Sequence, residues 1–163
     1  MRYRILIVLS FCTIASVFAF PSDLPNFYQL REQVFTSGQP SSRGYAQLEA
    51  MGIQTVINVL PEEECDPGEA TMVGSHNMVY IGHPFHPTDI QMETVVRFSK
   101  LLKYAEKPVL IHCSTGNHVG GLWVAYRVTI ENAPLDTAIL EGRQIGMQPS
   151  MEDLVLHWLA EQK

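Results

Sequence analysis

The sequence is poor in cysteine and in basic residues, and each shortage excludes a class of protein. Three cysteines among 163 residues are too few for a disulfide framework. Lysine and arginine together number 11 against 17 acidic residues, which gives a formal net charge of −6. Because the chain has no basic cluster, we do not expect it to bind nucleic acid or an anionic membrane surface. Internal repeats, low-complexity tracts and long linkers are also lacking.

The first 19 residues have the pattern of a secretory signal peptide. Arg2 and Arg4 precede an apolar run, which ends at Ala19 in a small residue suited to cleavage. The uninterrupted apolar stretch is short for a membrane span of about 20 residues, and polar residues follow at once. We therefore expect an exported protein, periplasmic or secreted, without stable membrane insertion after residues 1–19 are removed.

Cleavage would leave residues 20–163 as a single domain. It would remove Cys12 and two arginines, so the mature net charge becomes 9 − 17 = −8. A mature length of 163 − 19 = 144 residues is enough for one domain with a full hydrophobic core. Cys65 and Cys113 would be the remaining cysteines. Two cysteines of an exported protein can pair, but their positions in the sequence do not establish a bond.

Apolar segments of strand type alternate with segments of helix type along the chain. This order predicts an α/β fold with a mainly parallel sheet flanked by helices. We expect strands at about 27–30, 34–36, 55–60, 78–81 and 109–112, and helices at about 42–51, 69–76, 88–104, 122–130, 134–142 and from 150 onward. Ligands of such sheets bind at the carboxyl ends of the strands. The loops after Ile81 and after His112 are therefore the expected site.

The most distinctive pattern surrounds Cys113. This residue ends a buried strand, and a loop containing glycines leads from it through Gly121 into a helix. The N–H groups of such a loop can form a nest for an anion, and the helix N-terminus adds partial positive charge. Both effects favour the thiolate, which is the nucleophilic form of cysteine. The pattern predicts phosphoryl or sulfur transfer, and its alternative is a buried, inert cysteine at a strand end.

The run His-Cys-x-x-Gly resembles the signature of protein tyrosine and dual-specificity phosphatases. A closer resemblance is to the bacterial beta-lactamase-hydrolase-like phosphatase family. Four elements carry it in order: Ser37–Pro40 (SGQP), Gly52–Asn58 (GIQTVIN), Pro87-Thr88, and the strand Val109–Cys113 (VLIHC). The resemblance covers about residues 25–130, which is nearly the whole mature domain.

The resemblance implies that Cys113 is the nucleophile and forms a phosphocysteine, while His112 supports the loop and helps to hold the thiol ionised. It implies that the phosphate is held by the backbone of Ser114, Thr115, Gly116, Asn117, His118 and Val119. An acid on the loop after Ile81 would protonate the leaving group, and Asp89 is the only carboxylate there. His86, when protonated, is the alternative. No cofactor or metal is implied, and the partner would be a phosphorylated small molecule or a phosphoprotein.

The chain departs from the resembled signature at its arginine. That arginine lies six residues after the cysteine, where this chain has Val119, or five residues after it in a shorter loop, where this chain has His118. Arginine holds phosphate through two charge-assisted hydrogen bonds. Their loss would lower the rate on the order of 10²–10⁴. Activity is therefore expected to be weak or lost, and a protonated His118 would replace part of the function at acidic pH.

Three other functions remain open at the level of the sequence. The first is a pseudophosphatase that binds an anion or a phosphorylated ligand without turnover. The second is a zinc or copper site, since His83, His86, His118 and Cys113 offer nitrogen and sulfur ligands, although not at a recognised spacing. The third is sulfur transfer, because the spacing from Cys113 to His118 fits the rhodanese loop. The Ser37–Pro40 element argues against this third possibility.

Overall fold

A computed structural model describes residues 23–162, so the expected signal segment lies outside the described residues. The strands are β1 (Tyr28–Arg31), β2 (Val34–Ser37), β3 (Thr55–Asn58), β4 (Val79–Gly82) and β5 (Val109–His112). They form one sheet in the order β1-β2-β5-β3-β4. Only the β1–β2 pair of this sheet is antiparallel. The predicted α/β class with a mainly parallel sheet is confirmed.

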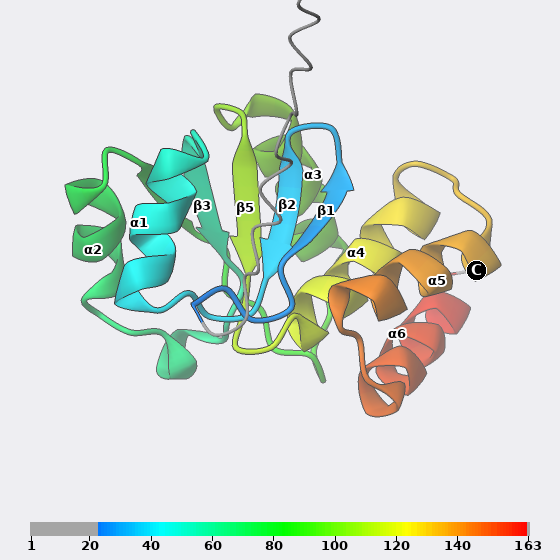
Figure 1. Cartoon of the computed structure of the whole chain (residues 1–163). Helices are drawn as coiled ribbons and strands as arrows, with labels where there is room; N and C mark the ends of the chain where they lie inside the picture. The colour runs from blue at the N-terminus through cyan, green and yellow to red at the C-terminus, as the bar shows by residue number, and fades with distance from the viewer. Residues whose placement is uncertain (1–22, 163) are drawn as a thin grey trace, which may run out of the picture.

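Helices cover both faces of the sheet. They are α1 (Ser42–Ala50), α2 (Glu69–Ser75), α3 (Met92–Tyr104), α4 (Asn117–Thr129), α5 (Leu135–Ile145) and α6 (Pro149–Glu161), with a short 3-10 helix, η1, at Glu62–Glu64. Figure 1 shows α1 and α2 on one side of the sheet, α3 and α4 on the other, and α5 and α6 packed outside α4. None of the helices in residues 23–162 is long and apolar enough to cross a membrane.

The two central strands are buried on both faces, which explains their continuous apolar sequences. Every residue of β3 and β5 is buried. Alternate side chains of a strand point to opposite faces, so Leu110 joins the core beneath α1 and α2, while Ile111 joins the larger core beneath α3 and α4. This double burial fixes β5, and with it the position of the residue that follows it, Cys113.

The helix after Cys113 begins earlier than the sequence predicted. The expected start was at 122, but α4 begins at Asn117, immediately after Gly116. Gly116 has a φ of +90°, a left-handed conformation that favours glycine, and this residue turns the chain from the loop into the helix. The loop is therefore short, and His118 and Val119 belong to the first turn of α4. The prediction was wrong because the pair Gly120-Gly121 is typical of a loop. The opposite error occurred at α3, which begins at 92 rather than 88, because residues 87–88 form a turn and Gln91 is the N-cap.

Glycines in α4 allow other helices to approach its backbone. A Cβ atom at Gly120 would lie 2.7 Å from the carbonyl oxygen of Gly142 in α5 and 2.8 Å from Cβ of Met147. A Cβ atom at Gly121 would lie 2.6 Å from the sulfur of Met151 in α6. Close packing of α5 and α6 on the first turns of α4 therefore depends on these two glycines.

Replacing Gly120 by alanine should destabilise the protein, although alanine is the better helix former. The added methyl group meets a backbone carbonyl that cannot move freely, so we expect a loss of about 1–3 kcal/mol in the free energy of unfolding. Gly74→Ala in α2 is the matched control, because its Cβ would meet nothing within 4 Å. Urea unfolding should show the control unchanged or stabilised by up to about 1 kcal/mol. Equal losses in both variants would contradict this packing.

Candidate active site

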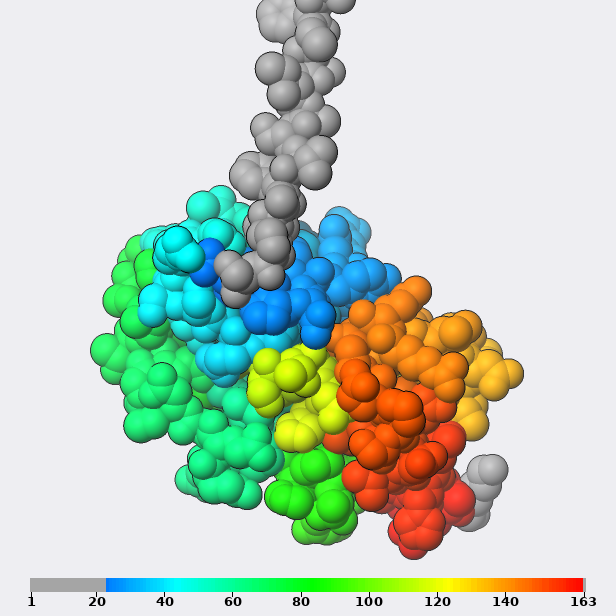
Figure 2. Space-filling model, turned by 60° about the horizontal axis from the view of Figure 1, so that its bottom comes forward, coloured from blue at the N-terminus to red at the C-terminus, as the bar shows by residue number. Residues whose placement is uncertain are grey.

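Cys113 lies at the carboxyl end of β5 under the loop that leads into α4. Its side chain is 1% exposed, and its sulfur accepts a hydrogen bond from the Gly116 N–H at 3.1 Å. The segment 113–118, drawn yellow-green in Figure 2, lies at the centre of this face of the molecule. It is bordered there by the chain before α1, the chain before α3 and the α5–α6 connection. The structure thus places the loops predicted from the sequence at one edge of the sheet.

Neighbouring segments hold the carbonyl groups of the loop. The Gln39 N–H donates to the Ser114 carbonyl at 3.1 Å, and the Asn26 side-chain amide donates to the Thr115 carbonyl at 2.9 Å. In a trans peptide the N–H points away from the C=O, so these bonds direct the N–H groups of Thr115 and Gly116 toward the thiol side. The Gly116 N–H does reach the sulfur. This orientation is the one that the predicted anion nest requires, and the nest itself stays a prediction.

The connection between α5 and α6 holds the other end of the loop. A Cβ atom at Gly116 would lie 2.3 Å from the Ile145 carbonyl oxygen, so only glycine allows this approach. The Asn117 side chain accepts a hydrogen bond from the Gln148 N–H at 2.8 Å. The loop and the start of α4 are therefore fixed by contacts from both sides.

A buried polar cluster lies on the α1 and α2 side of His112. The Nε2 atom of His112, which is fully buried, is 2.9 Å from the Glu69 carboxylate, within ion-pair range but without hydrogen-bond geometry. Glu69 is 2% exposed and accepts hydrogen bonds from Tyr45, from Gln39 at 3.0 Å and from Asn58 at 2.6 Å. We call Gln39, Tyr45, Asn58, Glu69 and His112 the Glu69 cluster. Five segments of the chain meet in it.

The Glu69 carboxylate stays ionised in spite of its burial. Burial opposes ionisation, but the contact with His112 and the hydrogen bonds from Tyr45 and Gln39 outweigh it and lower the pKa of Glu69 to about 2. Burial, together with the Glu69 carboxylate, in turn raises the pKa of Tyr45. A negative charge therefore lies beside His112, the residue that precedes Cys113. Sequence reasoning missed Glu69 and Tyr45, although Gln39 and Asn58 belong to the resembled motifs.

His118 lies in the first turn of α4 and packs with its edge against the ring of Phe85, with the ring centroids 6.0 Å apart. Its Nδ1 atom is buried and has no hydrogen-bond partner. Burial lowers the pKa of His118, the charge of His86 adds to this effect, and Glu64 opposes it. His118 therefore carries a charge only below the ordinary range of histidine. The pH at which His118 could act as a cation is therefore lower than we expected from the sequence.

Val119, the other residue at a position of the missing arginine, is fully buried in the core beneath α4. Four of the five arginines in residues 23–162 are paired with carboxylates: Arg31 with Glu131, Arg43 with Asp23, Arg127 with Glu131 and Glu141, and Arg143 with Glu152. The charge of the fifth, Arg97, acts on His83. None of these interactions involves the Cys113 loop.

The candidate proton donors lie in different surroundings. Asp89 is exposed, accepts a hydrogen bond from Gln91, and lines a hollow together with Leu154 and Trp158 of α6. His86 is exposed and bonds to the Thr88 hydroxyl at 2.7 Å. The charges of His86 and Glu64 act on His118. Of these two residues, Glu64 was missed in the sequence. The sequence feature that could have pointed to Glu64 is the acidic loop after β3, which lies at the same edge of the sheet as Cys113.

The structure does not bring the four proposed metal ligands together. His83 is 1% exposed, stacks on Phe98 with the ring centroids 5.9 Å apart, and contacts the Thr94 carbonyl. Burial lowers its pKa to about 4. Within residues 23–162, no group of three or more His, Cys, Asp or Glu side chains is placed to hold a metal ion. The set of His83, His86, His118 and Cys113 is therefore not a ligand cluster in this fold.

Cys65 and Cys113 are both free thiols. The Cys65 sulfur lies 3.4 Å from the Pro61 carbonyl, to which it donates. Burial raises the pKa of Cys65, and the neighbouring carboxylates of Glu69 and Glu62 add to this rise. The disulfide that the sequence left open is not formed, and the Cys65 thiol is kept in its protonated form.

The fold, with a cysteine at a strand end beneath a loop that opens a helix, places the chain in the class of cysteine-phosphatase-like proteins. The chain belongs to the tyrosine phosphatase family, because the model of that family matches residues 23–132. This result confirms the resemblance seen in the sequence.

Curated relatives agree with this assignment. The dual specificity protein phosphatase TpbA of Pseudomonas aeruginosa is 24% identical over 124 residues, which cover 74% of this chain and 55% of TpbA. The protein OCA1 of Mycosarcoma maydis is 31% identical over 128 residues, covering 74% of this chain and 79% of OCA1. The beta-lactamase hydrolase-like protein of Agrobacterium fabrum is 30% identical over 101 residues, covering 59% of this chain and 23% of that protein. The chain thus spans about half the length of TpbA.

Solved structures share the fold. P. aeruginosa TpbA in complex with phosphotyrosine superposes with a TM-score of 0.67 at 19% identity, covering 83% of this chain and 88% of that chain. The core catalytic domain of the PP-IP phosphatase SIW14 from Saccharomyces cerevisiae, in complex with citrate, superposes with a TM-score of 0.67 at 18% identity. The match covers 82% of this chain and 86% of that chain.

Replacing Glu69 by glutamine should make the free energy of unfolding less sensitive to a fall in pH below about 5. The pKa of Glu69 is about 2 in the folded protein against an ordinary 4.5, so its contribution is complete above pH 4.5 and is lost as the pH falls toward 2. Between about pH 5 and about pH 3, the free energy of unfolding should fall by up to about 2 kcal/mol less in Glu69→Gln than in the parent. Urea titrations at the two pH values measure this difference.

Glu32→Gln is the control for this experiment, because Glu32 is an exposed carboxylate in the turn between β1 and β2. The free energy of unfolding of this control should fall between about pH 5 and about pH 3 as much as that of the parent. If Glu69→Gln and the parent lose stability equally between these pH values, the Glu69 cluster does not hold a buried charge.

Proposed function

We propose that this protein is an exported phosphomonoester hydrolase of the tyrosine and dual-specificity phosphatase type, with Cys113 as the nucleophile and with slow turnover. The observation that carries the proposal is the hydrogen bond from the Gly116 N–H to the Cys113 sulfur, in a loop that ends at the N-terminus of α4. Donors that are already fixed around the sulfur would hold the equatorial oxygens of a phosphoryl group. Export rests on the pattern of residues 1–19 alone.

The reaction would proceed in two displacements. The Cys113 thiolate attacks phosphorus, so the S–P bond forms while the ester P–O bond breaks, and the leaving oxygen takes a proton. Water then attacks the phosphocysteine, the S–P bond breaks, and inorganic phosphate leaves with the thiolate restored. The nest of N–H groups and the α4 N-terminus would stabilise the phosphoryl oxygens in both steps.

His86 is favoured over Asp89 as the proton donor for the leaving group. Its charge acts on His118 at the border of the loop, whereas Asp89 is held by Gln91 and lines a hollow against α6. Histidine is also the side chain that most often serves as a general acid in enzymes.

The nest is proposed to work without its usual cation. His118 and Val119 stand at the two positions where the resembled signatures have arginine, and Val119 faces the core. The loss of two charge-assisted hydrogen bonds, each of roughly 1.5–3 kcal/mol, corresponds to a rate lower on the order of 10²–10⁴. Part of this loss would be recovered where His118 is protonated.

The charges beside the loop favour substrates with a single phosphate. A cavity bordered by Gln39, whose N–H holds the loop, is also lined by Glu64, Asp66 and Glu69. These carboxylates oppose a second phosphate. Among the relatives are a structure with bound phosphotyrosine and an inositol diphosphatase of Arabidopsis thaliana. A phosphotyrosine-like aryl ester therefore fits this site better than a polyphosphate does. The family and the Gln39 contact to Ser114 also favour phosphoryl over sulfur transfer.

A second candidate function is binding of a phosphorylated ligand without turnover. The observation in its favour is that the position six residues after Cys113 is filled by a valine packed in the core, so the side chain there adds no charge to the loop. A nest of backbone N–H groups can still hold an anion.

Hydrolysis of p-nitrophenyl phosphate, followed from about pH 4 to about pH 8, tests the proposal. Since the pKa of His118 is lowered, its cationic form is gained only as the pH falls below the ordinary histidine range, so the rate should rise in that direction. His118→Arg should raise the rate at neutral pH by about tenfold or more, because arginine stays charged there. Cys113→Ser should abolish the reaction at every pH.

His157→Arg is the matched control, because it makes the same exchange at an exposed position of α6 and should leave the rate unchanged. A parent no faster than Cys113→Ser at every pH contradicts the hydrolase. In that case, phosphotyrosine binding to the parent, measured by calorimetry, would establish the second candidate. Absence of binding would contradict both.

A further inference from the structure

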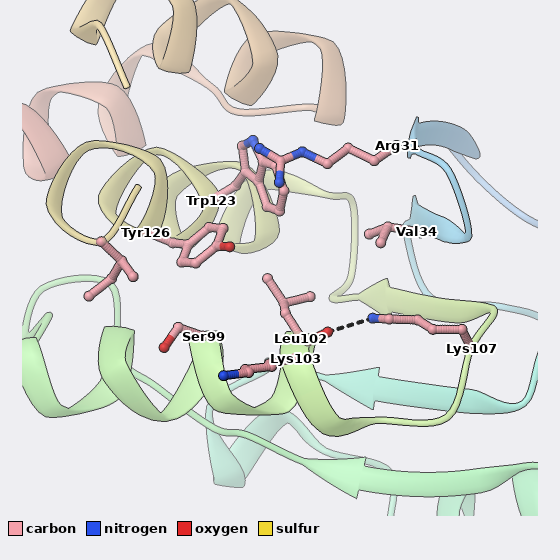
Figure 3. A pocket seen from close by; sticks show the side chains of 9 residues that line it. Arg31, Val34, Ser99, Leu102, Lys103, Lys107, Trp123 and Tyr126 are labelled. Carbon is pink, nitrogen blue, oxygen red and sulfur yellow. Dashed lines mark hydrogen bonds between the residues drawn. The ribbon is translucent and has the colours of Figure 1, made fainter. Parts of the chain in front are cut away.

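A second cavity lies at the opposite end of the sheet from Cys113. Its volume is about 360 Å³, within the range of small-molecule sites. Its lining includes Arg31, Leu102, Lys103, Lys107, Trp123 and Tyr126, together with Val34, the first residue of β2. In Figure 3, the aromatic side chains of α4 lie across the cavity from Leu102, Lys103 and Lys107 at the end of α3 and before β5.

One wall of the cavity is built on Arg31, Trp123 and Tyr126, whose polar groups are held by carboxylates. The Arg31 guanidinium lies 4.7 Å from the centre of the Trp123 ring (Figure 3). Glu131 accepts two hydrogen bonds from Arg31, at 2.9 and 2.7 Å, and one from the Tyr126 hydroxyl. Glu141 accepts the Trp123 indole N–H at 2.7 Å. The polar tips of this wall are thus satisfied within the protein. Trp123 is 1% and Tyr126 8% exposed, so the apolar surface that is open to a ligand comes mainly from Leu102 and Ile130.

The facing wall carries positive charge that the protein does not neutralise. The Lys107 ammonium donates to the Leu102 carbonyl at 2.7 Å, which uses one of its three N–H groups. Within residues 23–162, no carboxylate lies within ion-pair distance of Lys107 or Lys103. Burial lowers the pKa of Lys107, and no acidic group offsets this effect. The Lys103 ammonium is exposed and lies 5.2 Å from the centre of the Tyr104 ring. Lys107 is thus the half-buried cation of this cavity that lacks a carboxylate partner within the described residues, in a chain with a net charge of −6.

We propose that this cavity binds a small amphiphilic anion. Its acidic head would pair with Lys107 and Lys103, and its apolar body would lie against Leu102 and Ile130. A half-buried ammonium without a counter-ion is unfavourable, and an anionic ligand supplies the missing partner. The site shares no lining residue with the Cys113 loop, so the proposal is independent of the hydrolase reaction.

Fluorescence titration of the full chain with anilinonaphthalene sulfonate tests the site. The dye joins a sulfonate to flat aromatic rings, and N-phenylnaphthylamine offers the same rings without the charge. The sulfonate dye should bind at least about tenfold more tightly than the uncharged one, the factor expected for one charge-assisted hydrogen bond. Equal affinity for both dyes would overturn the proposal.

Variants locate the bound dye. Lys107→Met should weaken binding about ten- to hundredfold, whereas Lys107→Arg, which keeps the charge, should stay within about threefold of the parent. Lys103→Met, at an exposed position where misfolding is not expected, should also weaken it. Lys100→Met on the exposed face of α3 and Cys113→Ser are controls that should leave the affinity unchanged. Parent-like affinity in folded Lys107→Met and Lys103→Met would place the dye elsewhere and overturn the proposal.

Discussion

The candidate active site depends on one constraint, the left-handed turn at Gly116 that immediately precedes α4. Because Gly116 adopts a left-handed conformation and packs against the Ile145 carbonyl, its N–H points at the Cys113 sulfur. The glycines of the next turn let α5 and α6 close on the same helix. The direction of the Gly116 N–H and the packing of α5 and α6 therefore depend on the same contacts at the start of α4.

The electrostatics of the site oppose its chemistry. A phosphate nest normally gains from positive charge, but here the Glu69 carboxylate lies beside His112 and the charge of Glu64 acts on His118. Burial also lowers the pKa of His118, so this residue becomes charged only at a lower pH than an ordinary histidine. In the proposed reaction, anion binding would rest on backbone N–H groups and on the α4 N-terminus, which are fixed in place and need no reorganisation. This balance is the physical reason for proposing slow turnover of a phosphate monoester.

Much of this fold could be predicted from the sequence, since buried β-branched strands such as 55–58 and 109–112 alternate with amphipathic helices. The position of Cys113 followed from the same pattern. The early start of α4 could not be predicted, because Gly120 and Gly121 weaken a helix until contacts with α5 and α6 are known. The Glu69 cluster was missed for a similar reason. Its members are scattered over five segments, and only the tertiary fold brings the Glu69 carboxylate to His112.

The most direct test of the central claim is to trap the phosphocysteine. The parent should be mixed with p-nitrophenyl phosphate at acidic pH, quenched within one turnover, and digested for mass spectrometry. We predict one added phosphoryl group on the peptide that contains Cys113, and none in Cys113→Ser. Product formation with an unmodified Cys113 peptide at every quench time would contradict the account.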